Sequence, residues 1–173
     1  MLTYREYLDY AERSLVRVQD DEPASQWQLI PATILAWSAI ESFVNNMLDD
    51  FASLAPDTFQ LHERSFLLEN RLRFMNQGEN IGQFVLEGKE YRRLDDKIFF
   101  LIAKSGGRDL TNVKGETLWQ NFELFKDVRD SLVHPRKGKE VSITKEMVDG
   151  FIETSKLIIR LVSKNVWKKE VTF

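Results

Sequence analysis

The sequence predicts an all-α protein, an antiparallel bundle of five to six helices that forms one domain over residues 1–173. Apolar residues recur at intervals of three and four along most of the chain, which is the spacing of an amphipathic helix. The 8 glycines and 4 prolines fall in a few clusters between these stretches, where they indicate connections. No segment repeats and none has low complexity, so nothing in the pattern divides the chain further.

The first half of the chain is predicted to hold three helices. The first covers residues 3–18 and ends before a polar stretch. The second, over 31–54, is the longest and most apolar, and Pro31 suits its first turn because a first-turn residue needs no N–H donor. The third covers 56–76. Residues 77–92 contain three glycines, and we expect them to form a loose connection with at most a short helical turn.

Three more helices are predicted in the second half. The fourth covers 94–104 and stops at two consecutive glycines, which suit the left-handed conformation that ends many helices. The fifth covers 116–133 and is ended by Pro135, which disfavours helical geometry in the residue before it. The sixth runs from Thr144, a suitable N-cap, to about Lys168.

Composition narrows the class of protein. The chain carries 24 Lys and Arg against 27 Asp and Glu, a net charge of −3, which excludes a uniformly basic surface but allows a local basic patch. The absence of cysteine excludes zinc ribbons, iron–sulfur clusters and thiol nucleophiles. His62 and His134 are far apart and outside any metal-ligand spacing, so we expect neither a metal nor a cofactor. The adjacent Asp95 and Asp96 are expected to be solvated charges.

The same pattern predicts no association with a membrane. The longest apolar run, from Ile98 to Ala103, is far shorter than the ~18 residues of a spanning helix. The beginning of the chain carries Glu6, Asp9 and Glu12 where an export signal would be apolar. We therefore expect a cytoplasmic protein.

An arginine interrupts the apolar stripe of the fifth helix. With ~100° of rotation per residue, Arg129 falls within about 20° of Leu118, between the directions of Phe122 and Phe125. A guanidinium keeps its charge and needs hydrogen-bond partners wherever it is buried. Arg129 therefore either extends along the helix end to reach solvent or lies in a pocket that holds an anion or a carboxylate.

Glu41 is the corresponding anomaly on the second helix. It falls inside the apolar stripe, four residues after Trp37 and three before Val44. It is the natural candidate partner for Arg129, because such a pair contributes little net stability but orients the guanidinium. The alternative is that Glu41 faces solvent on a helix less buried than its composition suggests.

The end of the fifth helix combines groups suited to phosphate chemistry. His134 precedes Pro135, so we expect the chain to leave the helix there with an accessible imidazole that titrates near neutrality. Arg129, five residues earlier, carries a guanidinium that can stabilise an anion, and together the two groups are suited to proton transfer at a phosphate. The basic residues that follow are candidate substrate-binding groups, although for this cluster taken alone a solvated loop that also satisfies helix carbonyls is the better explanation; they are Arg136, Lys137 and Lys139.

The run from Arg129 through Asp130 to His134 resembles the Arg-x(4–6)-His signature of HEPN domains, the "higher eukaryotes and prokaryotes nucleotide-binding" superfamily, which includes many metal-independent ribonucleases. The segment Ala36-Trp-Ser-Ala-Ile-Glu-Ser-Phe-Val-Asn45 resembles the other core helix of that family. The resemblance implies that His134 is a general acid/base at the ribose 2′-hydroxyl, that Arg129 stabilises charge on the scissile phosphate, and that Asp130 orients it. Many members carry Asn after the Arg, and an aspartate adds negative charge beside a phosphate site.

The predicted function is a HEPN-type endoribonuclease of a defence or toxin–antitoxin kind, which cleaves single-stranded RNA without metal and leaves a cyclic phosphate. The expected partners are RNA, a second copy of the chain, and an antitoxin or other protein. A homodimer brings the 129–136 segments of two subunits together, and Trp119, which points off the main apolar face, offers material for the contact. The alternative is a non-catalytic HEPN-like helical module that binds a nucleotide, RNA or a protein partner; a third is a plain dimerising scaffold.

Overall fold

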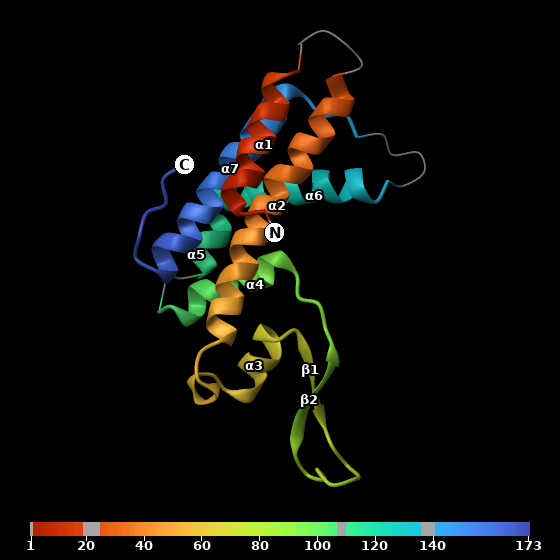
Figure 1. The fold of residues 1–173 in the computed structure, drawn as a ribbon, viewed down its shortest axis with the longest axis vertical. Coiled ribbons are helices and arrows are strands. Elements are labelled where there is room, and N and C mark those ends of the chain that lie inside the picture. Colours follow the sequence, from red (N-terminus) through yellow and green to blue (C-terminus); the bar gives the residue numbers. More distant parts are fainter. Residues whose placement is uncertain (1, 19–24, 107–109, 136–140) are drawn as a thin grey trace.

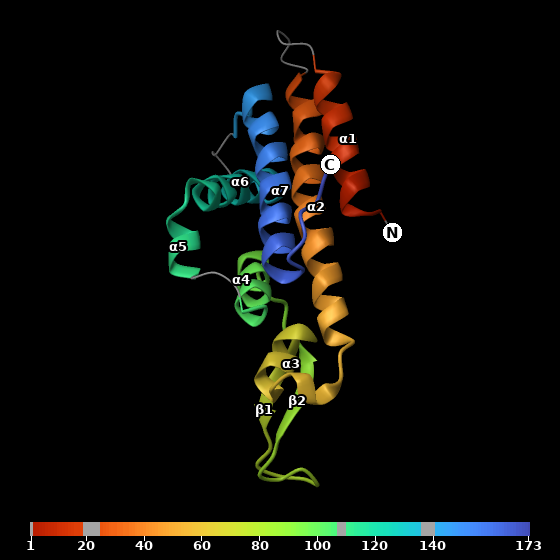
Figure 2. The same ribbon diagram turned by 90° about the vertical axis from the view of Figure 1, so that its left-hand side faces the viewer.

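The computed structural model describes residues 2–18, 25–106, 110–135 and 141–173. This part of the chain is an all-α bundle with seven α-helices and one two-stranded sheet, which confirms the predicted fold class. In Figures 1 and 2, α1, α2 and α7 lie side by side along the long axis, and α6 crosses them. In chain order the elements are α1 (Tyr4–Val16), α2 (Ser25–Ala52), the 3-10 turn η1 (Pro56–Thr58), α3 (Leu61–Leu67), β1 (Asn70–Phe74), β2 (Phe84–Lys89), α4 (Leu94–Lys104), α5 (Leu110–Gly115), α6 (Thr117–Val133) and α7 (Lys145–Val166).

Helix α2 is the centre of the core and contacts α1, α4, α6 and α7. Its fully buried residues include alanines, among them Ala36, whose backbone oxygen accepts a 3.0 Å hydrogen bond from the hydroxyl of Ser155 on α7. The short side chains let the two helices approach closely, and the buried hydroxyl still has an acceptor. In the part of the chain that the structure covers, no helix is both long enough and apolar enough to cross a membrane.

Several predicted helix ends are confirmed. Thr3 caps α1 in a capping box with Glu6, and the hydroxyl of Thr144 accepts a 3.2 Å hydrogen bond from Met147 N at the start of α7. Gly106 follows α4 with φ +63°, the left-handed conformation expected there. The predicted start of α2 is wrong, because the helix begins at Ser25 and Pro31 lies within it.

The largest difference from the predicted elements lies between α2 and α4. The third helix was expected to reach residue 76, but α3 ends at Leu67 and residues 70–89 form an antiparallel hairpin, β1 with β2. Residues 71–74 alternate polar and apolar side chains, so their apolar positions fit a strand as well as a helix. Gly78 and Gly82 adopt positive φ in the connection, so these glycines are hairpin residues and not part of a loose linker. The short helix α5 was also not predicted.

An ion pair fastens the crossing helix α6 to α4. Asp95, in the first turn of α4, accepts hydrogen bonds from Lys126 Nζ of α6 at 3.0 Å and from Arg93 at 2.7 Å, so the expectation of a solvated carboxylate is wrong. Burial by itself raises the pKa of Asp95, but the hydrogen bond and charge of Lys126, with Arg93, outweigh burial and hold the pKa below its usual value. The pair therefore contributes most to stability while Asp95 is ionised.

We predict that Asp95→Asn lowers the free energy of unfolding at neutral pH by about 1–3 kcal/mol, because it removes the anion that Lys126 and Arg93 share. Since the folded-state pKa of Asp95 is lowered, this stabilisation is present above the ordinary carboxylate pKa and is lost as the pH falls through the folded-state value. Urea unfolding from neutral into acid solution measures both effects. Asp96→Asn, at the exposed neighbouring carboxylate, is the control, and equal losses in the two variants would contradict the assignment.

Candidate functional site

The position of Arg129 follows from the aromatic side of α6. Phe122 and Phe125 are fully buried, and both rings lie with their centroids 5.3 Å from that of Trp37 on α2, the first stacked and the second edge-on. Arg129 comes one helical turn after Phe125 on the same side. It therefore lies where the aromatic contact reaches the surface, with one quarter of its side chain exposed.

The guanidinium of Arg129 is held on three sides. Its Cζ lies 5.5 Å from the ring centre of Trp37, a cation–π contact, and Nη1 donates a 2.9 Å hydrogen bond to Asp130. Nη2 lies 3.6 Å from Oε1 of Glu41, within ion-pair range but longer than a hydrogen bond. The structure thus brings together Arg129, Asp130 and Glu41, three of the residues that the sequence singled out.

Glu41 is itself oriented by the tryptophan. The indole Nε1 of Trp37 donates a 2.8 Å hydrogen bond to Oε1 of Glu41, four residues along α2. The carboxylate oxygen that faces Arg129 is therefore fixed from both sides. The sequence singled out Glu41 but not this role of Trp37, although the Trp-x-x-x-Glu spacing that places both side chains on one helix face was available as a signal.

The hydrogen-bonding capacity of Arg129 is only partly used. Its Nε is buried and has no partner in the described part of the chain, and Nη2 makes only the longer contact to Glu41. The carboxylates of Glu41 and Asp130 both lie within ion-pair distance of the guanidinium. Because Asp130 already accepts the hydrogen bond from Nη1, an added phosphate has to compete with it for this donor. Asp130 is about half exposed and can turn toward solvent, whereas the position of Glu41 is fixed.

His134 ends α6, as the sequence predicted. It is the C-cap, with φ −124° and ψ +67°, and its backbone N–H still bonds to the carbonyl of Asp130 at 2.9 Å. The residue is exposed, so the imidazole is open to solvent. The basic residues Arg136, Lys137 and Lys139 lie outside the described residues.

Trp119 does not have the location expected of it. Its side chain is only 5% exposed and packs against Phe99 of α4 and Phe122, with ring centroids 4.4 and 4.8 Å apart. It belongs to the core, because the neighbouring α4 covers the side of α6 to which it points. The large apolar side chains that α6 does expose are Leu124 and Val133.

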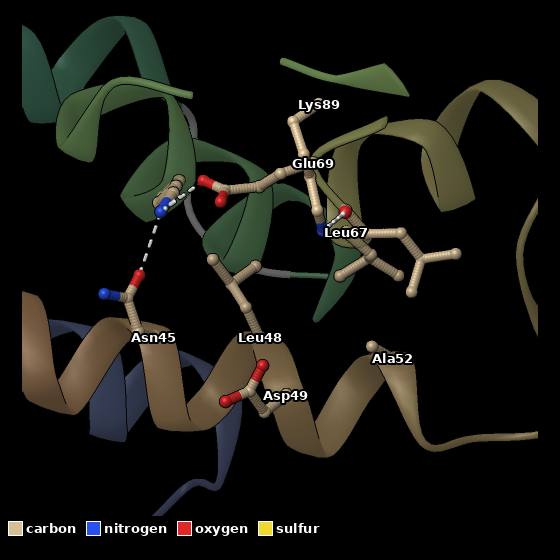
Figure 3. Close-up of a pocket in the computed structure, with 9 residues that line it drawn as sticks. Asn45, Leu48, Asp49, Ala52, Leu67, Glu69 and Lys89 are labelled. Carbon is tan, nitrogen blue, oxygen red and sulfur yellow. Dashed lines mark hydrogen bonds and ion pairs between the residues drawn. The ribbon is translucent and has the colours of Figure 1, made fainter. Parts of the chain in front are cut away.

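A separate cavity of about 290 Å³ lies among α2, α4 and the base of the hairpin (Figure 3). Lys97 crosses it, with Nζ 2.7 Å from Glu69 and 2.9 Å from the side-chain oxygen of Asn45. Burial raises the pKa of Glu69, but Lys97 and the backbone N–H of Arg92 outweigh it and lower the pKa. The charges and hydrogen bonds of Lys97, Glu69 and Asn45 are satisfied by one another. None of the predicted site residues lines this cavity. Within the described ranges, no three His, Asp or Glu side chains are gathered as metal ligands.

We predict that Arg129→Ala and Glu41→Gln are coupled in a double-mutant cycle, with an interaction energy of about 0.5–1 kcal/mol for this partly exposed pair. Urea unfolding of the wild type, both single variants and the double variant measures the coupling. Asp127→Asn, at an exposed carboxylate of the same helix, is the control partner for Glu41→Gln and should be additive. Additivity in both cycles would show that the Arg129–Glu41 contact contributes nothing.

Comparisons with known proteins add no relative to this geometry: no family model, no curated protein and no solved structure matches the chain.

Proposed function

We propose that this chain is a metal-independent endoribonuclease of the HEPN type that cleaves single-stranded RNA in the cytoplasm. The observation that carries the proposal is the end of α6, where a partly exposed, oriented guanidinium is followed five residues later by an exposed histidine. The contact with Trp37 restricts the plane of the Arg129 guanidinium, and Nη2 keeps capacity for an added anion. Such a donor, with an exposed imidazole five residues further along the chain, suits chemistry at a phosphodiester.

The proposed reaction uses the RNA as its own nucleophile. The ribose 2′-oxygen attacks the phosphorus, the bond from phosphorus to the 5′-oxygen breaks, and the products are a 2′,3′-cyclic phosphate and a 5′-hydroxyl. A neutral imidazole of His134 accepts the 2′-hydroxyl proton, and a protonated one donates to the leaving 5′-oxygen. Arg129 stabilises the charge that develops on the phosphoryl oxygens, and Asp130 positions it.

This division of roles asks for two copies of the site. One His134 per chain supplies one proton-transfer group, whereas the reaction uses an acid and a base. A two-fold dimer brings the same segment from both subunits together and supplies the second group. In the proposed dimer the 129–136 segments face each other, and Leu124 and Val133 replace Trp119 as the apolar material that α6 offers.

A second candidate function is favoured by the charge balance around Arg129. Asp130 and Glu41 already neutralise the guanidinium, which is the arrangement of a structural cation. In that case the domain is a non-catalytic HEPN-like module that binds a nucleotide, RNA or a protein such as an antitoxin. The two functions differ in whether His134 is required for RNA cleavage.

We predict that His134→Ala lowers the rate of RNA cleavage at least about 100-fold, the usual contribution of a general acid or base. The variant should keep its stability within about 1 kcal/mol, because His134 is exposed at a helix end. The assay uses a labelled single-stranded RNA in EDTA, with detection of the cyclic phosphate. His62→Ala removes the other histidine, also exposed, and should cleave like the wild type. Equal cleavage by all three proteins, or none by the wild type, would favour the non-catalytic module.

We also predict that the wild type is a dimer at micromolar concentration, which light scattering and sedimentation measure directly. Leu124→Ser should weaken the dimer, because this side chain is 55% exposed on α6, whereas Leu157→Ser, at a 44% exposed leucine of α7, should not. A wild-type monomer would remove the composite site.

A further inference from the structure

One face of the β1–β2 hairpin is apolar along its outer part, and Lys89 lies opposite Asn70 at its base. Phe74 lies opposite Phe84 and Leu72 opposite Leu86, and because alternate residues of a strand share a face, these four side chains form one apolar surface. Phe74 and Phe84 are 53% and 56% exposed, with their rings edge to face at 5.2 Å. The other face carries the charged residues Arg71, Arg73 and Glu87.

The outer end of this apolar face, at Phe74 and Phe84, is exposed, whereas Leu72 and Leu86 nearer its base are partly buried. The hairpin projects from the lower end of the molecule (Figures 1 and 2), and only α3 packs beside β1 at its base. A two-stranded hairpin alone is marginally stable in water. Its apolar face therefore gains stability when another surface packs on it.

The base of the hairpin is fixed to the body. Glu69, which precedes β1, holds a left-handed backbone with φ +49° that is uncommon outside glycine, and its carboxylate pairs with Lys97 of α4 at 2.7 Å. Lys97 Nζ also donates a hydrogen bond to Asn45 of α2, so one partly buried cation joins the hairpin to two helices (Figure 3). The backbone N–H of Glu90 also bonds to the carbonyl of Glu69, at 2.7 Å. These contacts fix the direction in which the hairpin projects. A loop that only faced solvent would not need a fixed direction.

Both edges of the hairpin are protected against the addition of a further strand. β1 carries Arg71 and Arg73, and charged side chains are a common protection of edge strands. In β2, Gly88 is left out of the pairing between Glu87 and Lys89 and has φ +71°, which is a bulge that interrupts the edge. The surface available for binding is therefore the apolar face and not an edge.

The four apolar side chains along the outer part of this face favour a second copy of the chain over RNA. A phosphate backbone needs basic side chains, but Arg71 and Arg73 lie on the opposite face and Arg73 is paired with Glu87 at 2.9 Å. Two identical apolar faces packed about a two-fold axis bury like against like and leave the arginines of both copies in solvent.

The area also agrees with a contact that is shared with α6. A phenylalanine has a surface of ~200 Å², and Phe74 and Phe84 each expose about half of it. The two residues in two copies therefore offer roughly 400 Å², which is below the ~1,200 Å² that a specific dimer buries. The hairpin contact is thus one part of a larger interface. In Figure 1 the C-terminal end of α6 and the hairpin both lie to the right of the lower end of α2.

We propose that the hairpin is a dimerisation arm whose apolar face packs against the same face of a second copy. The inference rests on the homodimer of the proposed function, and it names a contact that is separate from Arg129 and His134. Phe74 and Phe84 are its centre, and the partly buried pair of Lys97 and Glu69 holds it in the direction that the two-fold contact requires.

The chain has no cysteine, so single engineered cysteines report on this contact directly. Phe74 and Arg73 are neighbours in β1 that lie on opposite faces of the strand, and both are accessible. Phe74 is 53% exposed, and the side chain of Arg73 is 57% exposed, so Phe74→Cys and Arg73→Cys form a matched pair. Under mild oxidation at micromolar concentration, Phe74→Cys should form at least ten times more disulfide-linked dimer than Arg73→Cys. Thermal unfolding of the reduced variants verifies that both are folded. If Phe74→Cys does not fold, Ile81→Cys, at the exposed tip of the hairpin, is the second probe.

The outcomes separate this inference from the nuclease assignment. Equal linking of the Phe74→Cys and Arg73→Cys variants, or no linking of either, overturns the arm, whether or not the wild type is dimeric and cleaves RNA. Selective linking of Phe74→Cys supports the arm even if His134→Ala and wild type behave alike toward RNA. If neither variant links and labelled oligo-uridylate protects Phe74→Cys from alkylation, the face belongs to RNA.

Discussion

The contact between Trp37 and α6 connects the core of this protein to its surface chemistry. The indole packs against Phe122 and Phe125, carries the guanidinium of Arg129 over its ring, and donates its N–H to Glu41. A buried tryptophan needs an acceptor for that N–H, and the acceptor here is also the partner of the arginine. The orientation of the site therefore depends on the angle at which α6 crosses α2, and a shift of this helix would disturb packing, hydrogen bond and ion pair together.

Apolar packing holds all the helices together, and the elements that cross the bundle add directional ion pairs to it. α1, α2 and α7 bury continuous apolar stripes against one another. α4, α6 and the hairpin are shorter or cross the bundle, and partly buried cations join them to their neighbours: Lys126 to Asp95, Lys97 to Glu69 and Arg129 to Glu41. Such pairs add little net stability compared with apolar packing, but their hydrogen bonds are directional. They fix where the crossing elements lie, which is what the site and the hairpin require.

The sequence was informative wherever one element decided the answer. The helical period placed Arg129 and Glu41 inside apolar stripes, and Pro135 placed the helix end at His134. It failed where two elements had to meet. Leu68, Leu72 and Met75 fit a helical period, and only their pairing partner, β2, makes a hairpin of this segment. Trp119 looked free because the covering α4 could not be foreseen, and Asp95 looked solvated because Lys126 comes from another helix.

Pro31 gives α2 a discontinuity near its beginning. Proline has no N–H, so the carbonyl of Trp27 lacks its helical donor, and Trp27 itself is 78% exposed. The buried part of the helix starts around Leu29 and Ala32, and Trp27 and Gln28 just before it are exposed. The helical turn before Pro31 can open and re-form while the rest of α2 stays helical. Amide protons in this turn therefore exchange with solvent by local opening, whereas those in the core exchange only by global unfolding.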